Sequence, residues 1–217
     1  MKIIKKQKIE NNNKNVWSLT SIVYDPYALY DLCIFGTSMI KHIRVESFFT
    51  GGDCIKNVFL KSISGGRILD VYNFIRSRTF LQCKYFMLTV GSNDCDCGNN
   101  KAPRGETTVD LAQQIIDEYM ILINYLRNFY SNPKIFVNQL IPRTRTRYSK
   151  EIFESNRIKL NSYLENLTKT DDSLVFVKHP AFENVDKLNT MLYDGVHIHP
   201  VNGVPIYVNE IKSVFIN

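Results

Sequence analysis

The sequence predicts an α/β protein: a three-layer sandwich in which helices cover both faces of a mostly parallel sheet of about five strands. Two observations support this prediction. Short, unbroken apolar runs alternate along the chain with longer segments of helical periodicity, and no internal repeat is visible. The chain has 217 residues, 44% of them hydrophobic and 22% charged, which suits one globular domain with its own core.

The predicted strands are unbroken apolar runs rich in β-branched and aromatic residues, so we expect them to be buried on both faces. They are residues 32–35, 58–60, 85–90, 135–137 and 174–177. The predicted helices lie at about residues 38–47, 67–77, 108–130, 149–168 and 202–214. The clearest is 108–130, whose apolar residues recur at helical spacing. Strands that alternate with helices imply right-handed crossovers between parallel strands.

The positive charge is concentrated at the N-terminus. The net charge is +6, and the first 15 residues hold five of the 27 basic residues but one of the 21 acidic ones. We therefore divide the chain into a basic polar extension, residues 1–20, and a globular domain, residues 21–217. Such an extension is typically solvated, and weak contact with nucleic-acid phosphates is its alternative role.

The sequence predicts an intracellular, cytoplasmic protein. The N-terminus lacks the apolar segment of a secretory signal, and no run of about 18 uncharged apolar residues predicts a transmembrane segment. Five cysteines are an odd number, which favours reduced thiols over a disulfide framework. Cys95-Asp-Cys97 lacks the spacing of a zinc site, so we predict no metal there.

Glycines and polar residues follow the first three predicted strands, at the edge where parallel sheets bind ligands. Ser38 opens a predicted helix, where it is either an N-cap or a hydroxyl exposed beside backbone N–H groups. Gly65 lies in a turn that either only reverses the chain or offers a bare N–H to a ligand oxygen. Asn93 either closes a turn on its own backbone or directs an amide donor into a site.

A carboxylate and an imidazole lie close together near the C-terminus. Asp194 and His197 are three residues apart, so in a tight loop the carboxylate can reach Nδ1 and leave Nε2 free as a base. The same pair could be solvated or could bind a metal, with His199 as a further ligand. No second carboxylate cluster supports a metal.

Together these four blocks resemble the SGNH, or GDSL-like, hydrolase family, which is named for its Ser, Gly, Asn and His. The resemblance spans about residues 31–214 and rests on Phe-Gly-Thr-Ser (35–38), Ile-Ser-Gly (63–65), Val-Gly-Ser-Asn-Asp (90–94) and Asp-Gly-Val-His (194–197). More narrowly, residues 36–43, 90–94, 141–143 and 193–197 look like SGNH domains encoded by some mobile genetic elements.

The resemblance implies an SGNH-hydrolase (flavodoxin-like) architecture and a serine esterase that needs no cofactor. Ser38 would be the nucleophile, His197 the base and Asp194 the residue that orients it. The backbone N–H groups of Ser38 and Gly65 and the Asn93 amide would form the oxyanion hole. The substrates would be acetyl or short-acyl esters of small molecules, carbohydrates or lipids.

One residue departs from the family pattern. Thr37 stands where the family carries an aspartate that helps to order the site. We therefore expect reduced or retuned activity, and the alternative is a catalytically degenerate binding module, possibly associated with nucleic acid.

Three arginines follow the fourth predicted strand, at the same edge of the sheet. Arg143, Arg145 and Arg147 belong either to a solvated loop or to a site for an anionic substrate group or phosphates. We predict that they bind substrate, together with Thr37. A nucleic-acid-binding protein, dominated by the basic extension and these arginines, is the third hypothesis.

Overall fold

The computed structural model describes residues 28–48, 55, 57–78, 82–97, 111–131 and 133–216. The predicted extension, residues 1–20, and the first residues of the predicted domain lie outside the described residues.

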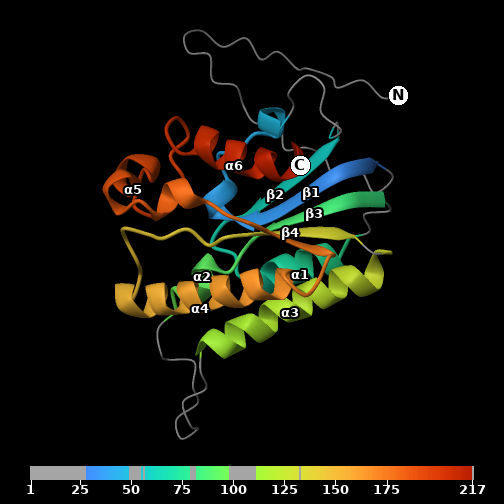
Figure 1. Cartoon of the computed structure of the whole chain (residues 1–217), viewed down its shortest axis with the longest axis horizontal. Helices are drawn as coiled ribbons and strands as arrows, with labels where there is room; N and C mark the ends of the chain where they lie inside the picture. The colour runs from blue at the N-terminus through green and yellow to red at the C-terminus, as the bar shows by residue number, and fades with distance from the viewer. Residues whose placement is uncertain are drawn as a thin grey trace, which may run out of the picture.

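A five-stranded parallel sheet forms the centre of the molecule. Its strands are β1 (Leu29–Thr37), β2 (Val58–Ile63), β3 (Gln82–Thr89), β4 (Lys134–Asn138) and β5 (Leu174–Val177). Their order is β2-β1-β3-β4-β5, so the direction of progression reverses between β1 and β3 (Figure 1). Ligands bind at such a reversal, outside the carboxyl ends of the strands. The predicted fold class is confirmed.

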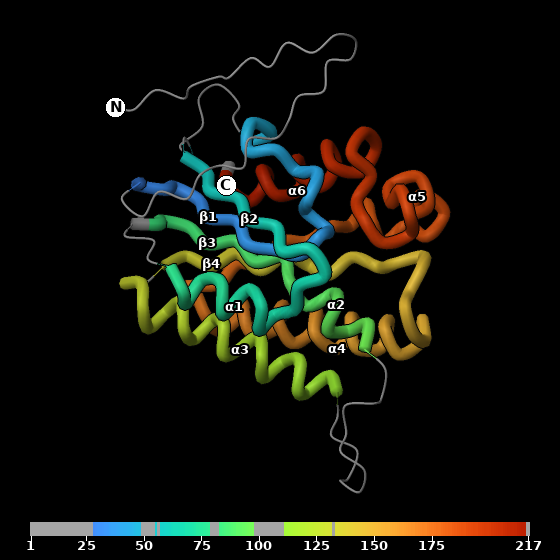
Figure 2. Tube along the Cα trace, turned by 180° about the vertical axis from the view of Figure 1, so that it is seen from behind, coloured from blue at the N-terminus to red at the C-terminus, as the bar shows by residue number. Residues whose placement is uncertain are grey.

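Helices cover both faces of this sheet, as the two opposite views show (Figures 1 and 2). On one face lie α1 (Ile68–Arg76), α2 (Ser92–Cys95), α3 (Leu111–Phe129) and α4 (Lys150–Thr168). On the other lie α5 (Val185–Met191) and α6 (Val204–Ile216), with the 3-10 turns η1 (Ser38–Ile40), η2 (Val45–Phe48) and η4 (Pro180–Glu183).

Each face of the sheet has its own apolar core, because side chains alternate along a strand. In β1, Phe35 packs into the core beneath α1 and α3, whereas Ile34 packs into the core beneath α6. In β3, Phe86 and Met87 divide in the same way. Burial on both faces explains why the strands appear in the sequence as uninterrupted apolar runs.

The helix predicted for residues 38–47 is wrong. The structure has two short 3-10 turns there, η1 and η2, and the N–H groups of Lys41 and Ile43 donate to carbonyls three residues earlier. Met39, Ile40 and Ile43 are all buried against the sheet, so tertiary packing overrides the local helical pattern. The sequence analysis also missed α2 and α5, because one or two turns give too little periodicity to detect.

Among the described residues, no helix has the length and apolar character needed to cross a bilayer. Cys33, Cys83, Cys95 and Cys97 are free thiols, and Cys54 lies outside the described residues.

Candidate active site

The carboxyl end of β1 presents a serine hydroxyl. The strand ends at Thr37, and Ser38 begins η1, whose next two residues are buried and fix the turn onto the sheet. Thr37 rather than Ser38 holds the N-cap position of this turn. The Ser38 side chain instead turns toward the C-terminal segment, where its Oγ lies 2.9 Å from His197 Nε2. Ser38 is 6% exposed.

A tight loop places the imidazole opposite this hydroxyl. Asp194 Oδ1 accepts hydrogen bonds from the N–H groups of Val196 and His197, and Asp194 Oδ2 lies 2.6 Å from His197 Nδ1. A bridge between Leu192 and Ile198, both buried, closes the loop beneath it. The side-chain oxygens of Asp194 therefore order both the backbone and the ring of the loop.

The charge state of Asp194 fixes the tautomer of His197. Burial alone would raise the pKa of Asp194. The hydrogen bonds that it accepts from the His197 N–H, the imidazole and the Val196 N–H outweigh that effect and lower its pKa to about 2. The ionised carboxylate accepts a hydrogen bond from Nδ1–H, so Nε2 carries a lone pair that can accept a hydrogen bond from the Ser38 hydroxyl.

The third and second sequence blocks supply N–H donors near the serine. Asn93 lies in α2, directly after β3, and its Nδ2 donates to the Gly66 carbonyl at 2.8 Å. An amide nitrogen has two hydrogens, so one N–H of Asn93 is left for a ligand. Gly65 is exposed with φ of +66°, and its N–H has no acceptor in the described part of the chain.

A buried arginine holds the Asn93 amide in its orientation. Arg143 is 3% exposed, and its NH2 group donates to Asn93 Oδ1 at 2.9 Å. Its NH1 group lies 3.1 Å from Asp96 Oδ2, which compensates part of the cost of burying the charge. Because Oδ1 faces Arg143, the Nδ2 end of the amide must point the other way, toward Gly66.

The segment after Arg143 connects the two halves of the site. The N–H groups of Thr144 and Arg145 donate to the Gly195 carbonyl, between Asp194 and His197, at 3.0 and 3.2 Å. The Arg147 N–H donates to Asp96, the same carboxylate that pairs with Arg143. Residues 143–147, which we call the brace, therefore bind both the histidine loop and α2.

Only glycine fits where the brace contacts the histidine loop. Gly195 has φ of +80°, and a Cβ there would lie 2.7 Å from Thr144 Oγ1 and 2.8 Å from Arg145 Cβ. A side chain would be strained by the backbone and would also push the brace away.

Comparisons with solved structures identify the fold that carries this site. A candidate acylhydrolase from Bacteroides fragilis superposes with a TM-score of 0.64 and 14% identity, over 85% of this chain and 85% of that one. A GDSL-like lipase from Bacteroides thetaiotaomicron gives 0.60 and 17%, over 85% and 86% of the two chains. A family 3 carbohydrate esterase from Talaromyces cellulolyticus gives 0.60 and 17%, over 87% and 97%.

The chain has the SGNH/GDSL hydrolase fold. No family model and no curated protein matches its sequence, so at this level of identity the comparisons establish the fold alone. The narrower resemblance to domains of mobile genetic elements stays a prediction.

Two residues predicted to bind substrate lie beneath the surface of this SGNH fold. Thr37 is fully buried, and its Oγ1 has no hydrogen-bond partner among the described residues. The Arg143 guanidinium donates hydrogen bonds to Asn93 and Asp96. Burial lowers the pKa of Arg143, and the Asp96 carboxylate partly opposes this shift. Both side chains are therefore buried beneath the site and not exposed to a substrate. Arg145 and Arg147 are exposed and contribute their backbone N–H groups to the brace.

Neighbouring histidines have other partners. His199 Nδ1 accepts hydrogen bonds from the N–H groups of Val201 and Asn202, so it caps the turn before α6. Tyr193 stacks on the His197 ring with 5.5 Å between centroids, and its hydroxyl accepts a hydrogen bond from Lys41. The described residues contain no group of three or more His, Cys, Asp or Glu side chains that could hold a metal ion.

A second histidine, which the sequence analysis did not predict, forms a polar network inside the molecule. His179 is fully buried after β5, with Nδ1 2.9 Å from Glu210 Oε2 and Nε2 2.9 Å from Asn138 Oδ1. Its ring stacks on Tyr207 in α6, 4.0 Å between centroids. Asn138 Nδ2 continues the network to Thr89 Oγ1 at 3.0 Å. The network ties the ends of β3, β4 and β5 to α6.

Proposed function

We propose that this protein is a serine esterase that hydrolyses carboxylic esters with acetyl or short acyl groups. The observation that supports the proposal most directly is one unbroken path of hydrogen bonds. It runs from Ser38 Oγ through both nitrogens of His197 to Asp194, at 2.9 and 2.6 Å. A hydroxyl becomes a nucleophile when a base oriented by a third group accepts its proton.

In the proposed reaction, Ser38 Oγ attacks the ester carbonyl and its proton passes to His197 Nε2. The carbonyl oxygen becomes an oxyanion, which the Ser38 and Gly65 N–H groups and the Asn93 amide would stabilise. His197 returns the proton to the leaving alcohol, and an acyl-Ser38 intermediate remains. Water, deprotonated by His197, then attacks this acyl group. The bond to Ser38 Oγ breaks, the acyl group leaves as the carboxylic acid, and His197 returns the proton to Oγ.

The test is covalent labelling of the folded protein with a fluorophosphonate, together with hydrolysis of 4-nitrophenyl acetate. We expect Ser38→Ala to abolish labelling and to lower kcat by about 10⁴-fold. Ser77→Ala is the matched control, because Ser77 is exposed at the far end of α1, where its hydroxyl donates to the Phe74 carbonyl and accepts from Arg78.

Folded wild-type protein that takes no label and releases no nitrophenol would contradict the proposal. That outcome would favour the degenerate binding module. Equal labelling of wild type and Ser38→Ala would place the reactive group elsewhere.

A further inference from the structure

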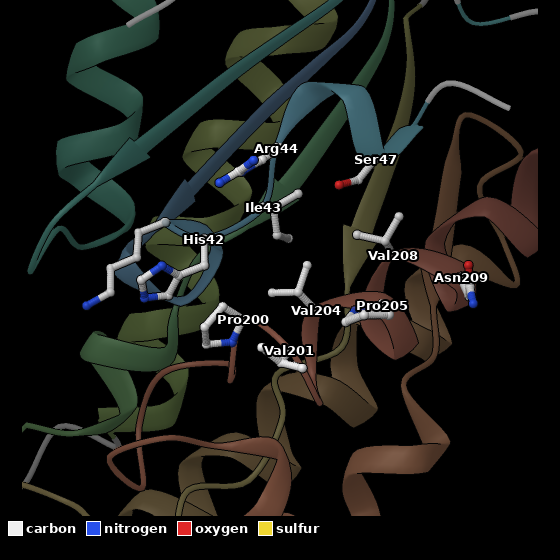
Figure 3. A pocket seen from close by; sticks show the side chains of 11 residues that line it. His42, Ile43, Arg44, Ser47, Pro200, Val201, Val204, Pro205, Val208 and Asn209 are labelled. Carbon is white, nitrogen blue, oxygen red and sulfur yellow. The ribbon is translucent and has the colours of Figure 1, made fainter. Parts of the chain in front are cut away.

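A pocket of about 550 Å³ lies beside the candidate active site. Its walls come from residues 41–47, which follow the serine turn, and from residues 200–209, which follow the histidine loop and begin α6 (Figure 3). Both segments that carry the candidate triad therefore continue into this pocket.

Two ring contacts connect the pocket to the triad. His42 lines the pocket, and its ring lies edge-on to Tyr193 with 5.5 Å between centroids. Tyr193 in turn stacks on His197, again at 5.5 Å. The wall of the pocket is therefore connected to the base through two ring contacts.

The pocket has one positively charged side and one apolar side. Lys41, His42, Arg44 and Ser47 come from the segment after the serine turn, whereas Val201, Val204, Pro205 and Val208 face them from the start of α6 (Figure 3). None of the lining residues is acidic.

Arg44 is the cation available to a ligand. Its side chain is exposed, and no acceptor for its guanidinium lies in the described part of the chain. Lys41 already donates to the Tyr193 hydroxyl. Burial lowers the pKa of His42, and the Lys41 charge lowers it further, so both favour the neutral ring.

We infer that this pocket binds a carboxylate carried by the ester substrate, with the guanidinium of Arg44 as its partner. The inference rests on the proposed esterase function and specifies its substrate class: esters with a carboxylate a short apolar distance from the reacting carbonyl. One free guanidinium matches the single charge of a carboxylate and can donate two parallel hydrogen bonds to its oxygens. The wall of valines and a proline suits the apolar link.

The kinetic test uses two pairs of esters, each with one anionic and one neutral member. For the alcohol side, the pair is 4-acetoxybenzoate and its methyl ester. For the acyl side, it is 4-nitrophenyl hydrogen adipate and its methyl ester. The readout is the ratio of kcat/KM for the anionic member to that for the neutral member. Comparing this ratio between variants cancels the intrinsic reactivity of each ester.

We expect Arg44→Gln to lower this ratio by roughly five- to tenfold for one of the two pairs. Arg76→Gln is the matched control, because Arg76 is an exposed arginine in the last turn of α1, and it should leave both ratios within about twofold. Ratios unchanged by Arg44→Gln for both pairs would overturn the inference.

A binding measurement separates this inference from the proposed reaction. Saturation-transfer NMR of the two anionic esters, 4-acetoxybenzoate and 4-nitrophenyl hydrogen adipate, with Ser38→Ala protein requires no turnover. For either ester, a signal kept in Ser38→Ala/Arg76→Gln and lost in Ser38→Ala/Arg44→Gln would support the carboxylate site even if the wild type hydrolysed no ester. Equal signals in the two double variants for both esters would contradict the site even if the esterase function held.

Discussion

Two histidines of this molecule have nearly the same hydrogen-bond connectivity but different surroundings. His197 has a carboxylate 2.6 Å from Nδ1 and an oxygen 2.9 Å from Nε2, and His179 has the same kinds of partner at 2.9 and 2.9 Å. The His197 side chain is 19% exposed, whereas that of His179 is fully buried.

The two histidines differ in the oxygen that lies next to Nε2 and in their access to solvent. Ser38 offers His197 a hydroxyl, which can lose its proton and attack a substrate. Asn138 offers His179 an amide oxygen, which can only accept a hydrogen bond. A carboxylate–histidine pair is therefore not in itself a sign of catalysis, and access to solvent and a neighbouring nucleophile distinguish His197 from His179. The His179 pair belongs to a buried polar network that fixes strand ends.

The largest expected change in kcat comes from replacing His197, the histidine of the exposed pair. His197→Ala should lower kcat for 4-nitrophenyl acetate by about 10³–10⁴-fold, because Ser38 loses the acceptor of its proton. The midpoint of thermal unfolding should change little, since the ring lies in a surface loop. Measured kcat and a calorimetric scan check both expectations. A large fall in the midpoint of thermal unfolding would contradict this prediction, because it would indicate that His197 stabilises the fold.

The buried pair should behave in the opposite way. His179→Ala removes the stacked ring and leaves Asn138 and Glu210 without their partner, so the free energy of unfolding should fall by about 2–4 kcal/mol. Urea denaturation measures this change. The kcat of the folded fraction should stay within about threefold of wild type. A loss as large as that of His197→Ala would remove the distinction between the two histidines.

Arg143 should act on the reaction through Asn93. Arg143→Met frees the Asn93 amide to rotate, so kcat should fall by about 10–100-fold while KM changes little. Arg143→Lys should recover part of this loss. In an Asn93→Ala background, Arg143→Met should cost little more, because the amide that it positions is gone. Fully additive losses in this double-mutant cycle would indicate a structural role for Arg143 alone.

The smallest expected effect is a pH dependence of stability from Asp94, next to Asn93. Burial and, to a lesser extent, Glu118 raise the pKa of Asp94 from 3.8 to about 6, although its carboxylate accepts the Ile68 N–H. Between these values the folded protein holds a proton that the unfolded chain releases, so its stability falls as pH rises. Asp194 does not interfere, because its pKa is lowered to about 2.

Asp94→Asn should remove this dependence. Between pH 4 and pH 7, its free energy of unfolding should rise relative to wild type by roughly 1–3 kcal/mol. Urea denaturation at several pH values measures the difference. Parallel profiles for the two proteins would contradict the raised pKa of Asp94.

The sequence was sufficient to predict the sheet and the edge of it where the candidate site residues gather. Strands buried on both faces leave unbroken apolar runs, and the glycine and polar residues that end them stand at the ligand-binding edge. The i to i+3 spacing of Asp194 and His197 is local, so the contact between their side chains could be predicted from the loop alone.

Contacts between distant residues that stand in no recognised motif could not be predicted from sequence. The partners of buried Arg143 are Asn93 in α2 and Asp96 directly after it, which lie 50 and 47 residues away along the chain. The His179 network joins residues from β4 and α6, and neither His179 nor Glu210 stands in a motif. The turns that replace the helix predicted for residues 38–47 follow from packing on the sheet.

The Gly195 carbonyl makes the two halves of the candidate site mechanically dependent on one another. This carbonyl accepts hydrogen bonds from two N–H groups of the brace, and the brace also binds α2 and the residue after it. We therefore expect a displacement of the His197 loop to displace the Asn93 amide as well. We therefore expect an insertion between residues 143 and 147 to displace both the His197 imidazole and the Asn93 amide. The length of the brace is therefore constrained by its contacts with both segments.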